Sequence, residues 1–491
     1  PNKIHEREMD KTDIPGTFSA RGGSAFGGNA IAGATLGPVN ETNMTRIWNH
    51  STKLMTSKHK QTSFDYAQDK NTPLKRKVFV GMSGGVDSSV AAALLKYGGF
   101  SAKDFRASQR LVSLWPRPAS GWDVTGVHIK MWSDPEIPCN FKEDRYDAMR
   151  AAAHLGIPFE TWDLTAEYKQ AVVEYMVAEY AAGRTPNPDV MCNREIKFGV
   201  FLRRALAEGA DFISTGHYVL LRKHPAEKHQ KSPPRILDSV ELLAPEHFSE
   251  KCSDRGRSEF KSFQQDISSA GNFSWKLVQA KDLNKDQSYF LWTLTQDQLR
   301  HCLFPIGEYT KPEVRAMAKK LGLPNARKPD SQGICFIGEI DLNAFLKKYI
   351  PVRRGVVVTT RGTVVGEHEG LSFYTIGQRH GIEIGGGIPY YVADKNPKTN
   401  TLVVAEGPYD EKLFSDELTV RGINWISGTQ PKLPLKCEVR IRYRQPLQKC
   451  TIRKTDGGIR VCFDEPQRAV TPGQSIVLYC DDEMLGGGII S

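Results

Sequence analysis

The chain has 491 residues, more than one ordinary domain needs, and 40% of them are hydrophobic, which excludes a protein that is disordered throughout. Its net charge of +10 and its pI near 9.0 favour an anionic partner such as nucleic acid, although an acidic protein partner or simple solubility would also account for the charge. No apolar run approaches the roughly 20 residues that cross a bilayer, and no hydrophobic core of a secretory signal follows the N-terminus.

The nine cysteines favour a reducing compartment, because their odd number and wide spacing do not suit a disulfide framework. They contain no Cys-x-x-Cys pair, so a zinc ribbon or a cysteine-held iron–sulfur cluster has no obvious ligands, and we predict no metal site of this kind. The early acidic residues Glu6, Glu8, Asp10 and Asp13 count against a mitochondrial transit peptide. We therefore predict a cytoplasmic protein, with a mitochondrial location as the alternative.

The chain begins with a stretch rich in Gly, Asn, Ser, Thr and Lys that has no apolar periodicity, and we expect a disordered polar tail at 1–74. Behind it, short apolar strands alternate with helical segments. This order predicts an α/β domain with a doubly wound parallel sheet at 75–348. The expected strands are 77–82, 124–129, 159–163 and 210–215, and the expected helices are 88–96 and 143–155.

The regular pattern is interrupted twice, by an irregular stretch at 98–121 and by a polar one at 222–275 that we interpret as a flexible surface insertion. The chain then becomes helical again up to 348, with expected helices at 296–303, 311–321 and 342–349. After Pro351 short alternating strands follow one another. They predict a small central β-rich domain at 349–417 and a C-terminal β-barrel at 418–491.

The segment Ser83-Gly84-Gly85-Val86-Asp87-Ser88-Ser89 lies between the first expected strand and the first expected helix. Two glycines let the backbone turn tightly and bring its N–H groups onto an anion, and the helix adds its positive N-terminal end. The loop differs from GxxxxGK[ST] because it is shorter and no lysine follows, and it resembles the PP-loop of N-type ATP pyrophosphatases. Asp87 suits magnesium, which prefers carboxylate and phosphate oxygens. The alternative is an ordinary Gly-Ser turn, but the strand before the loop and the helix after it favour ATP.

Two cysteines lie in segments that suit a working thiol. Near Cys192, Arg194 and Lys197 could stabilise a thiolate, and Asp189 could act as a base on a substrate. Cys335 is flanked by glycines and apolar residues, which suits a protected sulfur on a loop. Either cysteine, taken alone, is more readily explained as an inert residue or a small buried hydrophobe.

Eight segments in register resemble the tRNA-specific 2-thiouridylases. They are SGGVDSS, GRTPNPDVMCNREIKFG, STGHY, NKDQSYFLW, DSQGICFIGE, FYTIGQRHG, RIRYRQP and TPGQSIVLY. The resemblance covers about 75–491 apart from 98–121 and 222–275. The phosphate loop alone would be shared with GMP, NAD and asparagine synthetases, so the specificity comes from the other segments.

The resemblance implies a tRNA-uridine 2-sulfurtransferase that uses ATP and receives its sulfur from a separate carrier protein. In this chemistry ATP adenylates the C2 oxygen of the wobble uridine at position 34, and a persulfide on Cys335, loaded by a sulfur-carrier protein, supplies the sulfur. Cys192 attacks or resolves the persulfide, which leaves a transient Cys192–Cys335 disulfide. Asn187, Pro188 and Asp189 correspond to the residues beside the target base, and the implied cofactors are ATP and Mg²⁺.

The resemblance also assigns binding residues. For ATP it implies Gly81, Met82, Ser83, Gly84, Gly85, Val86, Asp87, Ser88, Ile129 and Gly216. For tRNA in the anticodon region it implies His217, Lys285, Asp286, Gln287, Arg442, Tyr443 and Gln474. Ile129 departs from the methionine expected at its position, which is harmless if the backbone contacts adenine; Met131 is a weaker candidate. The alternatives are another PP-loop synthetase that adenylates a small molecule and a non-catalytic tRNA-binding protein.

Overall fold

The computed structural model describes residues 76–98, 122–134, 141–225, 273–330, 342–382, 385, 387–456 and 458–491. These residues all belong to one compact unit, 70–491. The tail expected at 1–74, nearly all of the two expected insertions, and Cys335 lie outside the described residues. Within the described part, no helix is both long enough and apolar enough to cross a bilayer.

The N-terminal domain is built on a five-stranded, fully parallel sheet with the strand order β3-β2-β1-β4-β7. Its first strand alternates between two cores: Val78 and Val80 pack into one, and Phe79 packs into the other. The predicted doubly wound sheet is therefore confirmed. The strands are β1 (Arg76–Gly81), β2 (Trp122–Lys130), β3 (Phe159–Asp163), β4 (Phe212–Ser214) and β7 (Cys302–Leu303).

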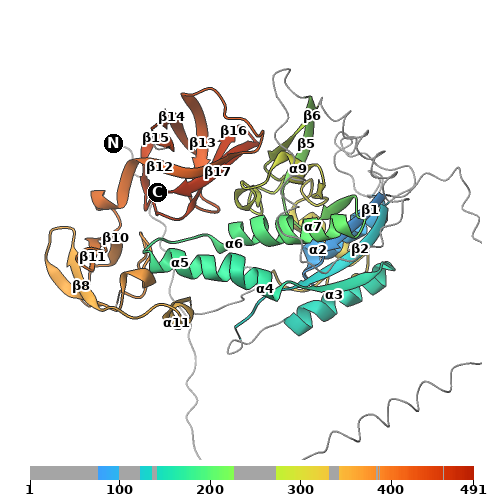
Figure 1. Ribbon diagram of the computed structural model, residues 1–491, viewed down its shortest axis with the longest axis horizontal. Coiled ribbons are helices and arrows are strands. Elements are labelled where there is room, and N and C mark those ends of the chain that lie inside the picture. Colours follow the sequence, from blue (N-terminus) through green and yellow to red (C-terminus); the bar gives the residue numbers. More distant parts are fainter. Residues whose placement is uncertain are drawn as a thin grey trace, which may run out of the picture. The chain divides into compact units, whose positions relative to one another are not determined.

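Helices cover both faces of this sheet (Figure 1). The core around Val78 also contains apolar side chains of α2 (Val86–Lys96), α3 (Phe141–Leu155) and α10 (Lys311–Lys320). The core around Phe79 contains side chains of two helical rods that include π-helical turns. The first rod is α4 (Thr165–Tyr168), η2 (Lys169–Glu174) and α5 (Tyr175–Ala181); the second is α6 (Pro188–Met191), η3 (Cys192–Val200) and α7 (Phe201–Ala207).

The segment expected to be helical at 296–303 is partly a strand. Thr295 and Gln298 form a capping box that starts a short helix, α9 (Gln296–Leu299). Cys302 and Leu303 then leave the helix and pair with β4 at the edge of the parallel sheet. The remaining short helices are η6 (Ser288–Phe290), α11 (Leu342–Lys347), η7 (Leu371–Phe373) and η8 (Glu411–Leu413).

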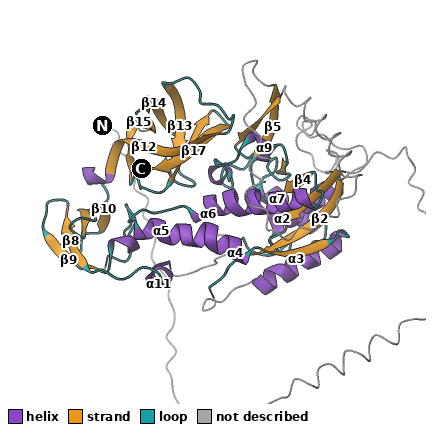
Figure 2. Ribbon diagram, viewed as in Figure 1, coloured by secondary structure: helices purple, strands orange, loops and turns teal. Residues whose placement is uncertain are grey.

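Two regions built mainly of strands follow, as Figure 2 shows. The central one is a four-stranded sheet with the order β10-β11-β8-β9, and the C-terminal one is closed into a six-stranded barrel because β12 pairs with both β15 and β17. The central strands are β8 (Gly355–Thr359), β9 (Val364–His368), β10 (Tyr390–Asn396) and β11 (Thr401–Glu406). The barrel strands are β12 (Phe414–Trp425), β13 (Leu435–Arg440), β14 (Gln448–Thr455), β15 (Gly458–Arg468), β16 (Ser475–Cys480) and β17 (Glu483–Ile490).

The ends of the segment expected as an insertion at 222–275 are ordered strands. β5 (Leu220–Pro225) and β6 (Phe273–Val278) form an antiparallel hairpin, and β6 pairs with β17 of the barrel. The hairpin therefore joins the α/β domain to the C-terminal barrel by backbone hydrogen bonding.

Candidate functional site

The predicted phosphate loop connects the end of β1 to the start of α2, at the carboxyl edge of the parallel sheet. Gly84 has a φ of +85°, and a Cβ at this residue would lie 2.3 Å from the carbonyl oxygen of Asp144, so only glycine fits. Helix α2 begins behind Gly85 without a side-chain cap, which leaves its first N–H groups available. The loop therefore has the backbone of an anion site.

Asn325 holds this loop from behind. Its buried side-chain Nδ2 donates to the carbonyl oxygens of Gly84 at 2.8 Å and Gly85 at 3.2 Å, and to Oγ of Ser89 at 2.9 Å. A peptide plane whose carbonyl is fixed on one side has its N–H fixed on the other side. These contacts therefore aim the N–H groups that follow the two glycines toward the opposite side of the loop. On the β4 side, a Cβ on Gly216 would lie 2.7 Å from the backbone nitrogen of Ser88.

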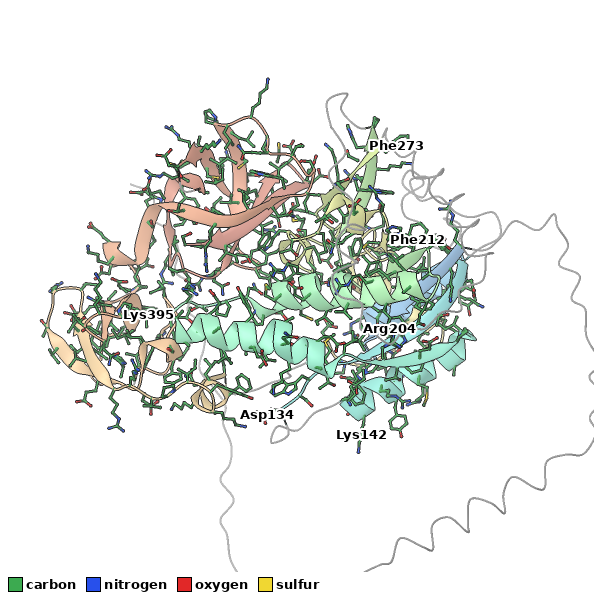
Figure 3. The ribbon with its side chains drawn as sticks, viewed as in Figure 1. Asp134, Lys142, Arg204, Phe212, Phe273 and Lys395 are labelled. Atoms are coloured by element: carbon green, nitrogen blue, oxygen red, sulfur yellow. The ribbon has the colours of Figure 1, made fainter. Side chains whose placement is uncertain are left out.

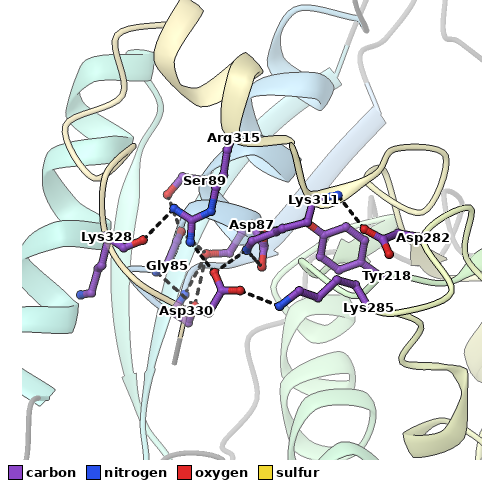
Figure 4. A network of polar contacts seen from close by, with 12 residues as sticks. Gly85, Asp87, Ser89, Tyr218, Asp282, Lys285, Lys311, Arg315, Lys328 and Asp330 are labelled. Atoms are coloured by element: carbon purple, nitrogen blue, oxygen red, sulfur yellow. Dashed lines mark hydrogen bonds and ion pairs between the residues drawn. The ribbon is translucent and has the colours of Figure 1, made fainter. Parts of the chain in front are cut away.

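A cluster of ion pairs adjoins the loop (Figure 4). The buried Nζ of Lys311 lies 2.7 and 2.8 Å from the two carboxylate oxygens of Asp87 and 2.8 Å from Asp330. Asp330 also binds Lys285 at 2.7 Å and Arg315 at 2.6 Å. Partial burial raises the pKa of Asp330, but the hydrogen bonds from Lys285 and Lys311 outweigh it and hold that pKa well below its usual range.

Tyr218 is a further neighbour of Asp87, to which its hydroxyl donates at 2.9 Å. Burial, together with the charge of Asp87, raises the pKa of Tyr218 far above its ordinary value, so the phenol stays protonated. The carboxylate of Asp87 thus accepts from an ammonium and a phenol at once. No group of three His, Cys, Asp or Glu side chains in the described part of the chain could hold a metal ion. A magnesium ion beside Asp87 would therefore take most of its ligands from phosphate oxygens and water, as magnesium commonly does.

The predicted adenine contact is placed in the sheet. Ile129 lies in β2 with its side chain buried in the core that contains Phe79 and Trp162, and Met131 is buried as well. The Ile129 side chain therefore packs in the core, and its contact with adenine stays a prediction.

The predicted base-contact segment starts the second helical rod. The Asn187 side chain accepts from the backbone N–H of Val190 at 3.2 Å, and Pro188 takes the first helical position, where its missing N–H costs nothing. This capping places Asp189 in the first turn of α6 and Cys192 at the start of η3. The rod continues into α7, where the ring of Phe201 would lie 3.7 Å from a Cβ on Gly81, at the start of the phosphate loop. The helix that carries Cys192 is thereby packed against the nucleotide end of the sheet.

The Cys192 side chain has 0% exposure, in a core that includes Val190, Met191 and Ile196. Its neighbours and burial indicate a protected sulfur in this conformation. The expected meeting of Cys192 with Cys335 stays a prediction, because Cys335 lies outside the described residues.

The residues predicted to contact tRNA are not equally available. His217 is buried between Phe198 and Phe304, and burial with the nearby charge of Lys197 holds the pKa of its imidazole well below the ordinary value. Asp286 is also buried, where it binds Arg440 at 2.9 Å. In this conformation these two side chains stabilise the protein interior and do not offer a surface to RNA.

The remaining predicted tRNA residues lie nearer the surface. Lys285 is engaged by Asp330, and Gln287 accepts from the backbone N–H of Tyr218 at 3.0 Å. The ring of Tyr443 packs against that of Phe290 at a tilt of 48°, with 4.4 Å between the ring centroids. Arg442 donates through Nη2 to the carbonyl oxygens of Ile376 and Ala469. Gln474 donates to the carbonyl oxygens of Thr185 and Pro186, both at 3.1 Å.

Sequence reasoning missed Lys311, Asn325 and Arg315 as parts of the site. Lys311 lies 224 residues from Asp87, and Asn325 lies 241 residues from Gly84. The only local signal was the capping box of α10, formed by Thr310 and Glu313, which fixes where the helix begins and so where Lys311 lies.

Comparison with protein families divides the chain in the same way as the structure. A model described as the tRNA methyl transferase HUP domain matches residues 76–109, 112–240 and 261–339. A model described as the tRNA methyl transferase PRC-barrel domain matches 343–406, and one described as the aminomethyltransferase beta-barrel domain matches 415–490.

Relatives of similar sequence match most of this chain. The tRNA-specific 2-thiouridylase MnmA 2 of Geobacillus kaustophilus is 41% identical over 422 residues, which are 85% of this chain and 95% of the relative. The tRNA-specific 2-thiouridylase MnmA of Pseudomonas paraeruginosa is 42% identical over 426 residues, with the same two coverages. At this identity and coverage, and with the predicted loop, sheet and barrel all in place, the chain belongs to the family of tRNA-specific 2-thiouridylases.

Proposed function

We propose that the chain is an ATP-dependent tRNA-uridine 2-sulfurtransferase that converts the wobble uridine to 2-thiouridine. The observation that carries this proposal is the phosphate loop: its glycine backbone is tied back by Asn325, and its Asp87 is held by Lys311, in a chain 41% identical to a tRNA-specific 2-thiouridylase. Such a loop suits pyrophosphate release from ATP, because fixed N–H groups stabilise the negative charge that develops on the leaving group.

The first step is adenylation of the base. The C2 oxygen of uridine attacks the α-phosphorus of ATP and pyrophosphate leaves, so that a poor leaving oxygen becomes part of AMP. Asp189, in the first turn of α6, is the group that we assign to the uridine N3 proton, since a carboxylate can accept it. Asn187 and Pro188 fix the position of Asp189 through the helix cap.

The second step moves sulfur. The terminal sulfur of a persulfide on Cys335 attacks C2 and AMP leaves; the Cys192 thiolate then attacks Sγ of Cys335, which frees the thiocarbonyl and leaves a Cys192–Cys335 disulfide. Two external thiols supply the electrons that reduce this disulfide. Because the Cys192 thiol is fully buried, the start of η3 must shift before this step. A π-helical turn suits such a shift, since these turns interrupt regular helix bonding.

The proposed partners follow from these steps. A persulfide-carrying protein must load Cys335, and the RNA must present an unstacked base, which costs least in a loop such as the anticodon. Lys285, Arg442, Tyr443 and Gln474 are the proposed contacts with that RNA. Both partners place the reaction in a reducing compartment, for which we propose the cytoplasm.

The proposal is tested by incubating the full-length protein with unmodified tRNA, ATP-Mg²⁺ and a persulfide donor, followed by mass spectrometry of the nucleosides. We expect 2-thiouridine and pyrophosphate from the wild type. Cys192→Ala and Cys335→Ala should each lose sulfur transfer on the order of a hundredfold or more. Cys480→Ser, an exposed barrel cysteine, should stay close to wild type. Full activity of Cys335→Ala, or a methyl group in place of sulfur, would contradict the proposal.

A further inference from the structure

The loop that precedes the predicted base contacts is held both from its own domain, where Arg184 binds Glu179 at 2.6 Å, and from the two β regions. Between the end of α5 at Ala181 and the start of α6 at Pro188, the chain has no regular secondary structure. Its groups make hydrogen bonds to the central sheet and to the C-terminal barrel. We call residues 183–187 the catalytic loop, because Asn187 ends it and Asp189 and Cys192 follow.

The barrel holds one side of the catalytic loop. The backbone N–H of Thr185 donates to the carbonyl oxygen of Pro472 at 2.9 Å, and Gln474 donates to Thr185 and Pro186. Between these two barrel residues, Gly473 has a φ of +93°, and a Cβ there would come within 2.8 Å of the Thr185 carbonyl oxygen. The barrel turn is therefore fitted to the loop at backbone distance.

The central sheet holds the other side, through Lys395 of β10 (Figure 3). Its Nζ donates to the carbonyl oxygen of Gly183 at 2.8 Å and to that of Tyr374 at 2.6 Å. The neighbouring hydroxyl of Thr375 lies 3.2 Å from that of Thr185. The catalytic loop is thus joined to the central sheet at both Gly183 and Thr185.

Lys395 has no carboxylate partner among the described residues. No ion pair there includes its ammonium, and burial lowers its pKa to about 8. A half-buried ammonium costs solvation that two carbonyl dipoles offset only in part. A neutral side chain would avoid that cost. We therefore explain the charge of Lys395 by the hydrogen bond that its ammonium donates to the backbone of the catalytic loop.

We propose that Lys395 is a positioning residue for sulfur transfer: from the central sheet, it fixes the catalytic loop so that Asn187, Asp189 and Cys192 meet the target base. This inference rests on the proposed function and goes beyond it, because it gives the central β-rich domain a part in the chemistry. Lys395 acts through geometry only, since it contacts carbonyl oxygens of the protein and no reacting atom.

The test compares Lys395→Met with Lys398→Met in the full-length protein. Both changes replace a lysine of the same hairpin, but Lys398 is exposed and does not contact the catalytic loop. At saturating ATP and tRNA, kcat for thiolation should fall between about tenfold and a hundredfold in Lys395→Met, because a small misplacement of reacting groups has effects of that size. KM for ATP and Kd for tRNA should stay within about twofold of wild type, since the phosphate loop has its own supports.

A second readout locates the effect. Hydrogen exchange of residues 183–192 should be faster in Lys395→Met, with the phosphate loop unchanged. Equal kcat in the two lysine variants, or a loss of tRNA affinity at unchanged kcat, would overturn the inference. If Lys395→Met does not fold, Thr375→Val removes the other central contact of the loop and should lower kcat in the same direction; no change there would also overturn it. A wild type that fails to thiolate tRNA would instead overturn the proposed function.

Discussion

The phosphate loop and the catalytic loop lie in the same α/β domain, yet different parts of the chain hold them. The phosphate loop is fixed within its own domain, by Asn325 behind its carbonyls and by Lys311 on Asp87. The catalytic loop is fixed by two other regions, through Lys395 and Gln474. The nucleotide half of the site is therefore complete within one domain, whereas the sulfur half depends on how three regions are assembled.

This difference gives the two β regions a structural part in the candidate site, because their residues bind the backbone of the catalytic loop. An α/β domain alone would keep the hydrogen bonds of Gly183 and Arg184 to Tyr180 and Glu179. Its catalytic loop would lose the bonds to Pro472, Gln474, Thr375 and Lys395. Gln474 is also a proposed tRNA contact. An RNA bound at this residue would therefore change the hydrogen bonds that Gln474 donates to the catalytic loop.

Gly84→Ala should reduce activity more than the other substitutions below, because it disrupts the phosphate loop. A Cβ there would lie 2.3 Å from the Asp144 carbonyl oxygen, in a left-handed backbone that alanine disfavours. We expect tRNA-dependent pyrophosphate release to fall on the order of a hundredfold. The matched control is Gly98→Ala, where φ is +70° but a Cβ would meet nothing within 4 Å. Equal losses in both variants would show that backbone strain, and not the fit of the loop, is responsible.

Lys311→Met should have the next largest effect, because it removes the cation shared by Asp87 and Asp330. We expect KM for ATP to rise by at least about tenfold, and the free energy of unfolding to fall by about 2 kcal/mol, a value reduced for the partial exposure of both carboxylates. Steady-state kinetics and urea titration measure the two effects. Lys319→Met, an exposed site on the same helix, is the control and should change neither quantity.

Asn325→Ala should act in the same half with a smaller effect. It deletes the donor for three loop acceptors while leaving all charges in place. A stability loss of about 1–3 kcal/mol is expected in denaturant titration, together with a rise of about tenfold in KM for ATP. Unchanged ATP kinetics would show that the loop keeps its shape without this amide.

The smallest expected effect is the pH dependence that Asp330 contributes. Its pKa in the folded protein is depressed, so its stabilising contribution is present above the unfolded value near 3.9 and is lost as the pH falls below it. Asp330→Asn should thus lower the free energy of unfolding by about 1 kcal/mol at pH 7. Urea titrations repeated at lower pH should show the difference from wild type shrinking below about pH 4. A difference that stays constant over this range would rule out a charge effect.

Local sequence pattern was sufficient for the strand, glycine loop and helix around Gly84, because each depends on residues close in the chain. The C-terminal barrel was equally visible, since its alternating strands are short and connected by turns. The pattern failed where distant pairing decides the structure: Cys302 and Leu303 look helical but complete the parallel sheet beside β4. It also missed Asn325 and Lys395, whose partners lie 241 and 212 residues away.

The resemblance supplied residues that local pattern could not, but it did not supply their orientation. His217 and Asp286 correspond to tRNA-contact positions, yet both are buried in the structure. Gln474, assigned only to RNA, supports the catalytic loop as well. Burial and partners of this kind follow from how the three regions pack together, which no single segment encodes.

We propose that this chain transfers sulfur from its own thiol to tRNA and consumes ATP in doing so. The most direct measurement is a single turnover with full-length protein that has been loaded with radiolabelled persulfide, freed of donor, and mixed with tRNA with or without ATP-Mg²⁺. We expect label in the tRNA only when ATP is present, in step with release of pyrophosphate. Label that stays on the protein, or that reaches tRNA equally well without ATP, would contradict it.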